Sequence, residues 1–488
     1  MALENATETE VTPAAATALW AFFALAIGVS LNYGYLSTSA LQWTVAGFAL
    51  ALMAMFRAWG GGRTTPSQHY ELLYAGLLGM AVFQWCLQPH WGFVGAAYVS
   101  LCHTFGEVFI GGVLLHALLP PRLRPIGLWI VVLGALALLG LNVHYYQHPG
   151  TDVWQLQQGA TDHLLHGRNP YTHEIPNSSR SGYFGYRIDY YDYLPLNLLV
   201  GLPGYLIGHD YRYSLVACVF VVVAVIQLAG RRLGVAPRLR DIITFAFLLH
   251  PANPFCMFQA WTEPMMLAVL ALFVYFAVRA PRGYGESICL LLLPTLKPYF
   301  LVPLFAYVPI LKPRFRSLLV GALVVAATLG PFLIWNYQAT IKYGLLFTLQ
   351  HVPFRGDSLS IPGWLYQNHK WQCGKLPALI AQIVVGGISF GFLRRRGLGG
   401  FLLLSAMALY ASFLAGSQAF TNYYFFVGGV LILAALVMAA PSRSVAAVLL
   451  ASDPALALPG PRFVETAQPI HDAPGIAAGP LDEAPKYQ

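Results

Sequence analysis

The sequence predicts an all-α, polytopic integral membrane protein. Only 10% of its 488 residues are charged and 57% are hydrophobic, whereas a soluble domain carries roughly 25% charged residues. The apolar residues also form runs long enough to cross a bilayer, such as ALWAFFALAIGVSLNYGYL and SLLVGALVVAATLGPFLIW. Because lipid offers the backbone no hydrogen-bond partner, we expect these runs to be helices. The composition excludes a soluble enzyme, a disordered chain and a collagen-like fibre.

We expect about twelve full transmembrane helices. They lie near residues 17–38, 40–56, 70–88, 92–118, 125–144, 212–230, 239–256, 261–279, 317–336, 376–393, 399–416 and 422–440. With the N-terminus in the cytoplasm, the basic clusters all fall on the cytoplasmic side, as the positive-inside rule requires. These clusters are Arg57 with Arg63, Arg122 with Arg124, Arg231 and Arg232 with Arg238 and Arg240, and Arg394 to Arg396. The net charge of +8 therefore reflects topology, and no basic patch with interleaved aromatics points to nucleic acid.

Two other apolar stretches are expected not to cross the membrane. Residues 194–208 are short, and a crossing there would move the following arginines to the outer side, so we expect a juxtamembrane or re-entrant helix. Residues 284–311 have basic residues on both flanks. We expect them to form a broken hairpin, with its break at Leu296-Lys297-Pro298, because proline disrupts a helix and lysine is costly in lipid.

The expected organisation has three parts. Residues 1–120 form an N-terminal extension with four spans, and its segment MALENATETE lacks the basic residues of a cleaved signal peptide. Residues 121–440 form a membrane core with large outer loops at about 145–211 and 337–375. Residues 441–488 are rich in Pro, Ala and Gly and are expected to be a disordered cytoplasmic tail.

The first outer loop begins with a predicted amphipathic helix. One face carries apolar residues at helical spacing, namely Val153, Leu156, Ala160 and Leu164. Such a helix is expected to lie flat in the membrane interface. Thr151 is the expected N-cap, which places Asp152 in the first turn, where the helix dipole favours an ionised carboxylate. Asp152 could merely complement that dipole, but a carboxylate directly after a span suits a general base for a membrane-borne substrate.

Other polar residues of this loop carry weaker signals. We expect Asp162, Asp189 and Asp192 to be solvated loop acids. The absence of DxD, HExxH and GxxxxGK[ST] motifs disfavours a nucleotide-sugar clamp, a zinc protease and an ATP-driven transporter. The histidines lack convincing ligand spacing; they are His144, His148, His163, His166 and His173. We assign no cofactor and no metal ligand, and a divalent metal is allowed but not indicated.

Lys297 is the most informative single residue. A charge within an apolar run is a functional hypothesis by default. A lipid-linked phosphate would supply its anionic partner, whereas the structural alternative is a lysine that snorkels to the interface. Glu263 opens a span at the outer surface and could line the same cavity or cap its own helix. Glu107, in the extension, is expected to have a paired structural role.

The second outer loop supplies further candidates. Among the polar residues of its sequence LQHVPFRGDSLSIPGWL are His351, Arg355, Asp357, Ser358 and Ser360. Arg355 could bind phosphate through two hydrogen bonds while the hydroxyls bond a sugar. Alternatively, Arg355 and Asp357 could pair with each other in a turn. Asn422, in QAFTNYYFF, begins the last span on the same side.

Taken in order, these features resemble the GT-C glycosyltransferases that use polyprenyl-phosphate sugars. The pattern D…G-x-x-P-Y…Y-x-P-L is similar to that of their bacterial mannosyltransferase-like branch. Here it consists of Asp152, Gly167, Pro170, Tyr171, Tyr193, Pro195 and Leu196. The Lys-Pro after an apolar half-helix, the RGDSLS loop and the QAFTNYY segment agree in kind. The resemblance covers roughly residues 121–440, and the four spans before the acidic loop depart from it.

The resemblance implies an inverting hexose transfer, with mannose as the first candidate, on the periplasmic face of a bacterial inner membrane. Asp152 would take the proton of a hydroxyl on a lipid or glycan acceptor, and that oxygen would attack the polyprenyl-phosphate sugar donor. Lys297 and Arg355 would stabilise the departing phosphate. The remaining substrate-binding candidates are His351, Asp357, Ser358, Ser360, Glu263, Tyr171, Tyr193 and Asn422.

Other classes of function also fit the spans. A transporter or lipid flippase without catalytic activity could use Lys297 and Glu107 to line its pathway. It does not explain two large outer loops with an interfacial helix, and the chain lacks the internal repeat common in transporters. A structural partner in an envelope-assembly complex is a third class. The sequence favours the glycosyltransferase.

Overall fold

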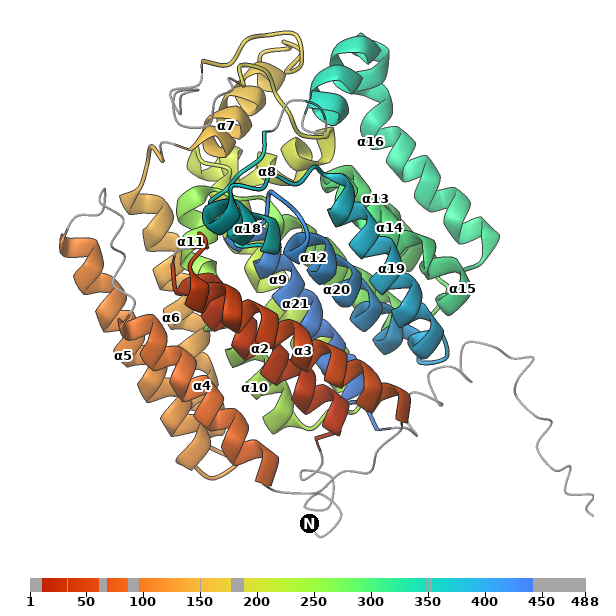
Figure 1. The fold of residues 1–488 in the computed structure, drawn as a ribbon. Helices are drawn as coiled ribbons and strands as arrows, with labels where there is room; N and C mark the ends of the chain where they lie inside the picture. Colours follow the sequence, from red (N-terminus) through yellow and green to blue (C-terminus); the bar gives the residue numbers. More distant parts are fainter. Residues whose placement is uncertain are drawn as a thin grey trace, which may run out of the picture.

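The computed structural model describes residues 11–32, 34–60, 68–86, 96–149, 151–176, 188–347, 350 and 353–441. Within them the regular structure is helical, with one isolated antiparallel bridge between Tyr35 and Ser358. Figure 1 shows long helices side by side, with α7 (Asp152–Leu165) near one end of the bundle. The predicted all-α class is confirmed. Residues 1–10, Arg63, His351 and the predicted tail after Pro441 lie outside the described residues.

Nine helices of the described chain are long and apolar enough to cross a membrane. They are α2 (Pro13–Ser30), α3 (Thr38–Gly60), α5 (Ala96–Leu118), α6 (Arg124–Tyr145), α9 (Arg212–Arg232), α16 (Phe315–Ile341), α19 (Leu376–Leu393), α20 (Gly397–Leu414) and α21 (Thr421–Met438). A tenth candidate is the pair α10 (Pro237–Leu248) and α11 (Ala252–Gln259), which bends by 43° at its break. The protein is therefore a polytopic membrane protein.

The prediction of twelve full spans is not confirmed, although each of the twelve segments contains a helix. Two of these helices fall short of the length and apolarity of a full span within the described residues. α4 (Gln68–Cys86) opens with the polar sequence QHYE. α12 (Glu263–Arg279) has only 17 residues, because Pro264 fixes its first turn and Glu263 begins it inside the protein.

Residues 284–311 form the predicted broken hairpin. α13 (Tyr284–Leu296) ends at Lys297, whose backbone is extended with φ −145° and ψ 125°. The chain returns through three short helices, η1 (Pro298–Phe300), α14 (Leu301–Phe305) and α15 (Tyr307–Leu311). The Tyr307 hydroxyl donates to Glu286 Oε1 over 3.0 Å, near the start of α13. Both ends of the stretch therefore meet, and Lys297 lies at the far tip.

The stretch 194–208 forms α8 (Pro195–Gly208), a helix of 14 residues. At that length it falls short of a span, which agrees with the prediction that this stretch does not cross. It folds back on the first turn of α9, where the Ser214 hydroxyl accepts from the Gly204 amide over 2.8 Å and donates to the Gly201 carbonyl over 3.1 Å.

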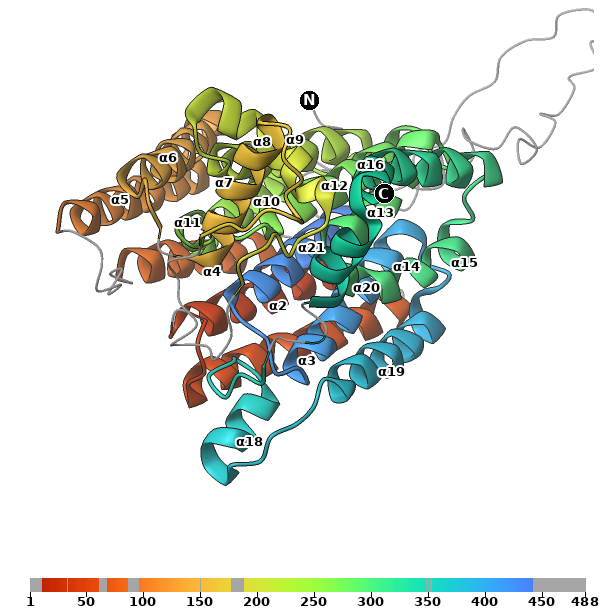
Figure 2. The same ribbon diagram turned by 90° about the horizontal axis from the view of Figure 1, so that it is seen from above.

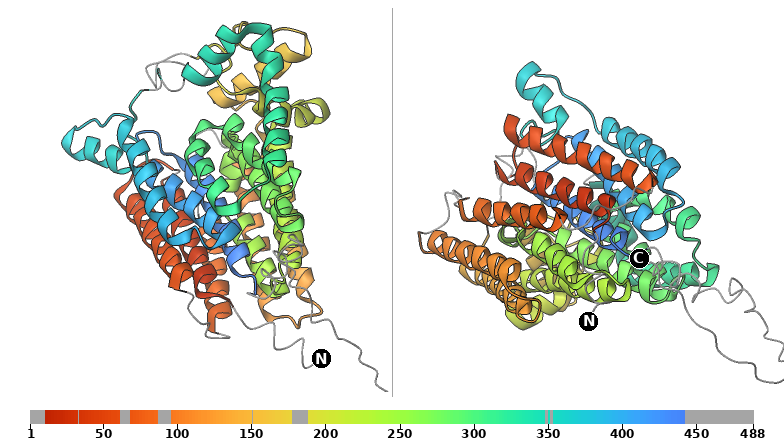
Figure 3. Two further views of the ribbon diagram at one scale, coloured as in Figure 1. Left: turned by 90° about the vertical axis from the view of Figure 1, so that its right-hand side faces the viewer. Right: turned by 90° about the horizontal axis from the view of Figure 1, so that it is seen from below.

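α2 is packed deep in the bundle, whereas α3 leaves much of its surface exposed. α2 packs against both α3 and α21, and the Thr12 hydroxyl donates to the Met438 carbonyl over 2.9 Å. At the other end Gly34 has a φ of +78°, and a Cβ there would collide with Thr421. Figures 2 and 3 show α2 and α3 next to α20 and α21, while α4 and α5 lie at the edge beside α6. The predicted 1–120 extension thus contains both central and peripheral helices.

Candidate functional site

The predicted helix after the first core span is α7, and its predicted cap is confirmed. Thr151 is extended, with φ −88° and ψ 143°, and its hydroxyl accepts from the Trp154 amide over 3.4 Å. The same hydroxyl donates to the Gln259 carbonyl over 3.2 Å, which ties α7 to the end of α11. Asp152 is therefore the first residue of a helix whose start is fixed on the bundle.

The apolar face of α7 is buried by protein, which differs from the prediction of a helix lying on lipid. Leu156 and Ala160 pack into a small separate core with Tyr171, Tyr191 and Phe332. Phe332 comes from α16, which continues past the predicted end of its span at residue 336. Phe332 itself lies within the predicted span, and Ala339, from the part of α16 beyond residue 336, packs against the same core. Protein side chains therefore bury the apolar stripe of α7.

A buried ion pair secures the opposite side of α7. The Trp154 indole donates to Asp210 Oδ2 over 3.1 Å, and Asp210 pairs with the fully buried Arg212 at 2.6 Å. Arg212 also donates to the carbonyls of Val143 and Tyr146 at the end of α6. The start of α7 is thus held by α6, α9 and α11, so the Asp152 carboxylate has a defined position.

Asp152 faces the two predicted cations. Its Oδ1 accepts from the Val153 amide over 2.8 Å. Burial raises the pKa of Asp152 above its ordinary value, and that amide together with the charges of Arg355 and Lys297 acts in the opposite direction. The electrostatic effect of both cations indicates that the two outer loops and the hairpin tip converge near this carboxylate.

Lys297 has an internal partner that sequence reasoning did not identify. Its Nζ donates to Glu263 Oε1 over 2.6 Å, and the Asn422 amide donates to the same oxygen over 2.8 Å. Nζ also lies 5.6 Å from the ring centroid of Tyr193 and 5.4 Å from that of Tyr423. Lys297 therefore does not snorkel, and its counter-charge comes from the protein.

Glu263 joins this cluster from the start of α12. Its side chain is fully buried, and it contacts Lys297 instead of capping its own helix through a side-chain hydrogen bond. Its other oxygen, Oε2, is buried with no hydrogen-bond partner in the described residues. Of the two roles considered for Glu263, the geometry agrees with a place in the polar cluster.

Asp192 is a site residue that the sequence interpretation missed. We expected a solvated loop acid, but its Oδ1 is buried and has no hydrogen-bond partner among the residues described. Burial and the charge of Asp152 raise the pKa of Asp192 to about 7, against the opposing charge of Lys297. One signal was available, because Asp192 directly precedes the Y-x-P-L motif. That motif leads into α8, where the Asn197 amide donates to the Leu296 carbonyl over 3.0 Å, next to Lys297.

In the second outer loop Arg355 and Asp357 pair with each other, which was one of the two alternatives considered for them. Arg355 donates to both carboxylate oxygens of Asp357, over 2.7 and 2.6 Å, and its guanidinium lies 4.6 Å from the centre of the Phe420 ring. The Ser358 and Ser360 hydroxyls are 2.7 Å apart, and Ser360 caps α18 (Ile361–His369) by accepting from Gly363 over 3.2 Å. In this structure both hydroxyls are buried and bonded within the protein, so the geometry does not offer them to a sugar.

The remaining predicted residues are dispersed. Tyr171 is fully buried, and its hydroxyl donates to the Tyr193 carbonyl over 2.7 Å. Its role is therefore to hold the backbone of Tyr193, whose ring lies near Lys297. Asp162 is a partly exposed acid paired with Arg168 at 3.0 Å, as expected for the loop surface. Glu107 is exposed on α5 and forms no ion pair within the described chain. Among the described residues no group of three or more His, Cys, Asp or Glu side chains could hold a metal ion.

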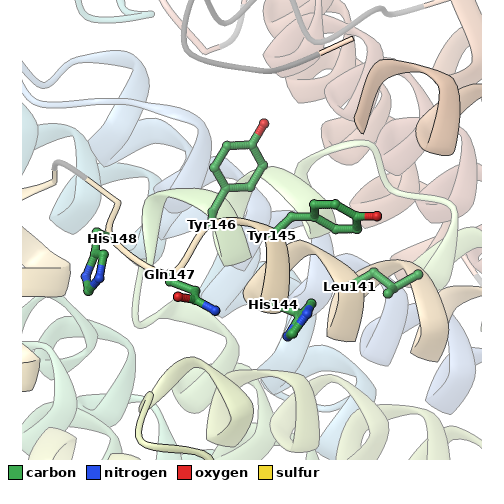
Figure 4. A pocket seen from close by; sticks show the side chains of 6 residues that line it. All are labelled: Leu141, His144, Tyr145, Tyr146, Gln147 and His148. Atoms are coloured by element: carbon green, nitrogen blue, oxygen red, sulfur yellow. The ribbon is translucent and has the colours of Figure 1, made fainter. Parts of the chain in front are cut away.

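An open recess of about 710 Å³ lies at the end of α6. Figure 4 shows its lining, formed by Leu141, His144, Tyr145, Tyr146, Gln147 and His148. The His148 ring is 5.7 Å from that of Trp154. Trp154 is two residues after Asp152, about 200° around the helix axis. The recess therefore borders the side of α7 turned away from Asp152, and we do not include it in the candidate site.

No protein-family model, curated protein or solved structure matches this chain. Fold and geometry define a helical membrane protein with a cluster of buried charged residues at one end of its bundle. The cluster is formed by Asp152, Asp192, Glu263, Lys297 and Asn422, and we call it the polar cluster.

Proposed function

We propose that this protein is a GT-C-type membrane glycosyltransferase. It transfers a hexose, with mannose as the first candidate, from a polyprenyl-phosphate donor to a lipid or glycan acceptor. The observation that carries the proposal is the position of Asp152, a partly buried carboxylate on a fixed helix outside the spans and within the field of Lys297 and Arg355. In this proposal the polar cluster faces the periplasm of a bacterial inner membrane, and both termini are cytoplasmic.

Asp152 acts as the general base. Its carboxylate removes the proton of the acceptor hydroxyl as that oxygen bonds to the anomeric carbon of the donor sugar. The bond between this carbon and the phosphate oxygen breaks, its electron pair stays on the phosphate, and the configuration inverts. The raised pKa of Asp152 supports this role, because a more basic carboxylate accepts a proton more readily.

Lys297 binds the departing phosphate. An ammonium group has three N–H donors, and the contact with Glu263 Oε1 uses one of them. A donor phosphate can therefore be bound without breaking the ion pair with Glu263. The charge of Arg355 also acts at Asp152, and its guanidinium is paired with Asp357. Charge on the leaving group develops next to cations that are already in place.

The alternative of a transporter has lost part of its basis. It allowed Lys297 and Glu107 to line one pathway, whereas Glu107 is exposed on the peripheral helix α5. Lys297 is paired with Glu263 inside the polar cluster. We therefore carry forward the glycosyltransferase as the single proposed function.

The decisive experiment is turnover of polyprenyl-phosphate mannose with purified protein and an extract of membrane acceptors. Asp152→Asn should lower transfer by about 100-fold or more, since general-base catalysis typically contributes at least that factor. The matched control is Asp162→Asn, in the same helix, which should stay within about twofold of wild type because Asp162 is partly exposed. More than a tenth of wild-type activity in Asp152→Asn would exclude Asp152 as the base.

A further inference from the structure

Several arginines gather at the end of the bundle opposite the polar cluster. α9 ends with Arg231 and Arg232, and α10 begins with Arg238 and Arg240. Figure 1 places α10 at the end away from α7, and Figure 3 shows the same separation from a second direction. Within the described residues none of these four arginines forms an ion pair. This end of the protein thus carries arginines that form no ion pair with a carboxylate in the described part of the chain.

Arg240 is the unusual member of this group. Only 8% of its surface is exposed, and its Nε is buried with no hydrogen-bond partner in the described chain. Its stem lies against Gly230 of α9, where an added Cβ would be 2.7 Å from the Arg240 Cδ and 3.1 Å from Leu436 of α21. The Arg240 stem is therefore packed between α9 and α21, and a side chain at position 230 would force it to move.

The neighbouring charged residues do not neutralise Arg240. Asp241 is adjacent, but its Oδ2 contacts His116 Nε2 at 3.0 Å and its Oδ1 accepts from Gln227 over 3.1 Å. Arg238 is directed elsewhere, over the rings of Tyr70 and Tyr74 at 4.8 and 5.0 Å. The charge of Arg231, which has the same sign, acts on Arg240 more strongly than the opposite charge of Asp241 does.

An anion from outside the chain would supply the counter-charge for Arg240. Burying a charge is unfavourable unless it is paired, and two adjacent guanidinium groups attract a group that offers several acceptor oxygens. A phosphate matches the planar fork of arginine, and basic pockets between membrane helices bind anionic lipid head groups. We propose that Arg240 and Arg231 bind the phosphate of an anionic phospholipid at this end of the bundle. The proposal is independent of the proposed function.

The test uses the full chain in lipid nanodiscs of three compositions. They contain phosphatidylcholine alone, phosphatidylcholine with phosphatidylglycerol, or phosphatidylcholine with inorganic phosphate in the buffer. The readouts are lipid retained by the protein in native mass spectrometry and the temperature of unfolding. We expect wild type to retain phosphatidylglycerol and to unfold at a higher temperature with it. Arg240→Gln should lower that retention about fivefold, the affinity that one arginine near an anionic surface typically contributes.

Two further variants keep the test decisive if Arg240→Gln folds poorly. Arg231 is exposed, so Arg231→Gln should fold normally and still lower the retention of phosphatidylglycerol. Arg395→Gln is the matched control, because Arg395 is an exposed arginine in the link between α19 and α20. The proposal is overturned if Arg231→Gln retains as much phosphatidylglycerol as Arg395→Gln. It is also overturned if inorganic phosphate alone gives the full stabilisation, which would assign the site to a soluble anion.

Discussion

At the scale of single residues, the polar cluster and its surroundings hold more carboxylates than cations. Asp152, Asp192, Glu263 and Asp357 face only Lys297 and Arg355. A phosphate donor adds further negative charge, so a proton held by one carboxylate would ease its binding. Asp192 is the carboxylate best suited to hold that proton, because burial and the charge of Asp152 raise its pKa to about 7. Asp152 thus acts directly on the acidic residue that the sequence did not single out.

Asp192→Asn should change both a pH–rate profile and a pH–stability profile. Wild-type Asp192 loses its proton near pH 7, which adds a negative charge where the donor phosphate is proposed to bind. The kcat/KM of the wild type should therefore fall as pH rises through this range, whereas Asp192→Asn stays neutral and should lack that fall. The pKa of Asp192 is 3.8 in the unfolded chain and about 7 in the folded protein. Between these two pH values only the folded protein keeps the Asp192 proton. Wild-type stability should therefore fall as pH rises through this window, and the variant should lack this part of the decline.

Thermal unfolding and initial rates, each measured from pH 4 to 8 in one detergent, provide this test. Asp189→Asn is the control, since Asp189 is a half-buried acid in the same segment, three residues before Asp192. Identical pH–rate profiles around pH 7 in wild type and Asp192→Asn would mean that the charge of Asp192 does not affect binding of the donor.

At the scale of elements, local signals predicted where helices start and break. Leu296-Lys297-Pro298 combines a proline with a charge inside an apolar run, and the hairpin breaks there. Thr151 followed by a helical apolar stripe gave the start of α7. These local signals could not predict which residues far apart in the chain contact each other. Glu263 is 34 residues from Lys297 and 159 from Asn422, and no periodicity joins them. Likewise, no local signal in α7 shows that Phe332, far along the chain in α16, packs into the same small core.

The ion pair between Lys297 and Glu263 should fasten the tip of the hairpin to α12. The Glu263 side chain is fully buried and that of Lys297 is 12% exposed. Glu263→Gln leaves a buried ammonium without its counter-charge, and Lys297→Met leaves a buried carboxylate. Each should lower the free energy of unfolding by about 3–5 kcal/mol, and the double variant should recover much of the loss.

Chemical unfolding of the four proteins in the same detergent forms a double-mutant cycle for this pair. The exposed pair of Asp162 and Arg168 serves as the reference, with side chains 40% and 44% exposed. Its removal should cost about 1 kcal/mol or less. If both single variants of the buried pair are as stable as wild type, the pair does not hold the hairpin tip.

At the scale of the whole molecule, the two ends of the bundle have opposite characters. One end holds the polar cluster with its excess of carboxylates, and the other holds the arginines of α9 and α10. The composition predicted a membrane protein and the basic clusters predicted this polarity. The central position of α2 could not be predicted in this way, because its sequence is apolar on all sides and does not show which helices it contacts.

The sidedness of the molecule can be tested by labelling on either side of one span. α19 separates Asn368, exposed at the end of α18, from Arg395, exposed in the link to α20. We expect Asn368→Cys to react with an impermeant maleimide in intact cells, and Arg395→Cys to react only after permeabilisation, since arginine-rich links stay in the cytoplasm. Arg394 and Arg396 remain, so the substitution keeps most of the local charge. The six native cysteines are free, so they are first replaced to remove background labelling. The reverse pattern would place the polar cluster in the cytoplasm, and the donor would then have to reach it from that side.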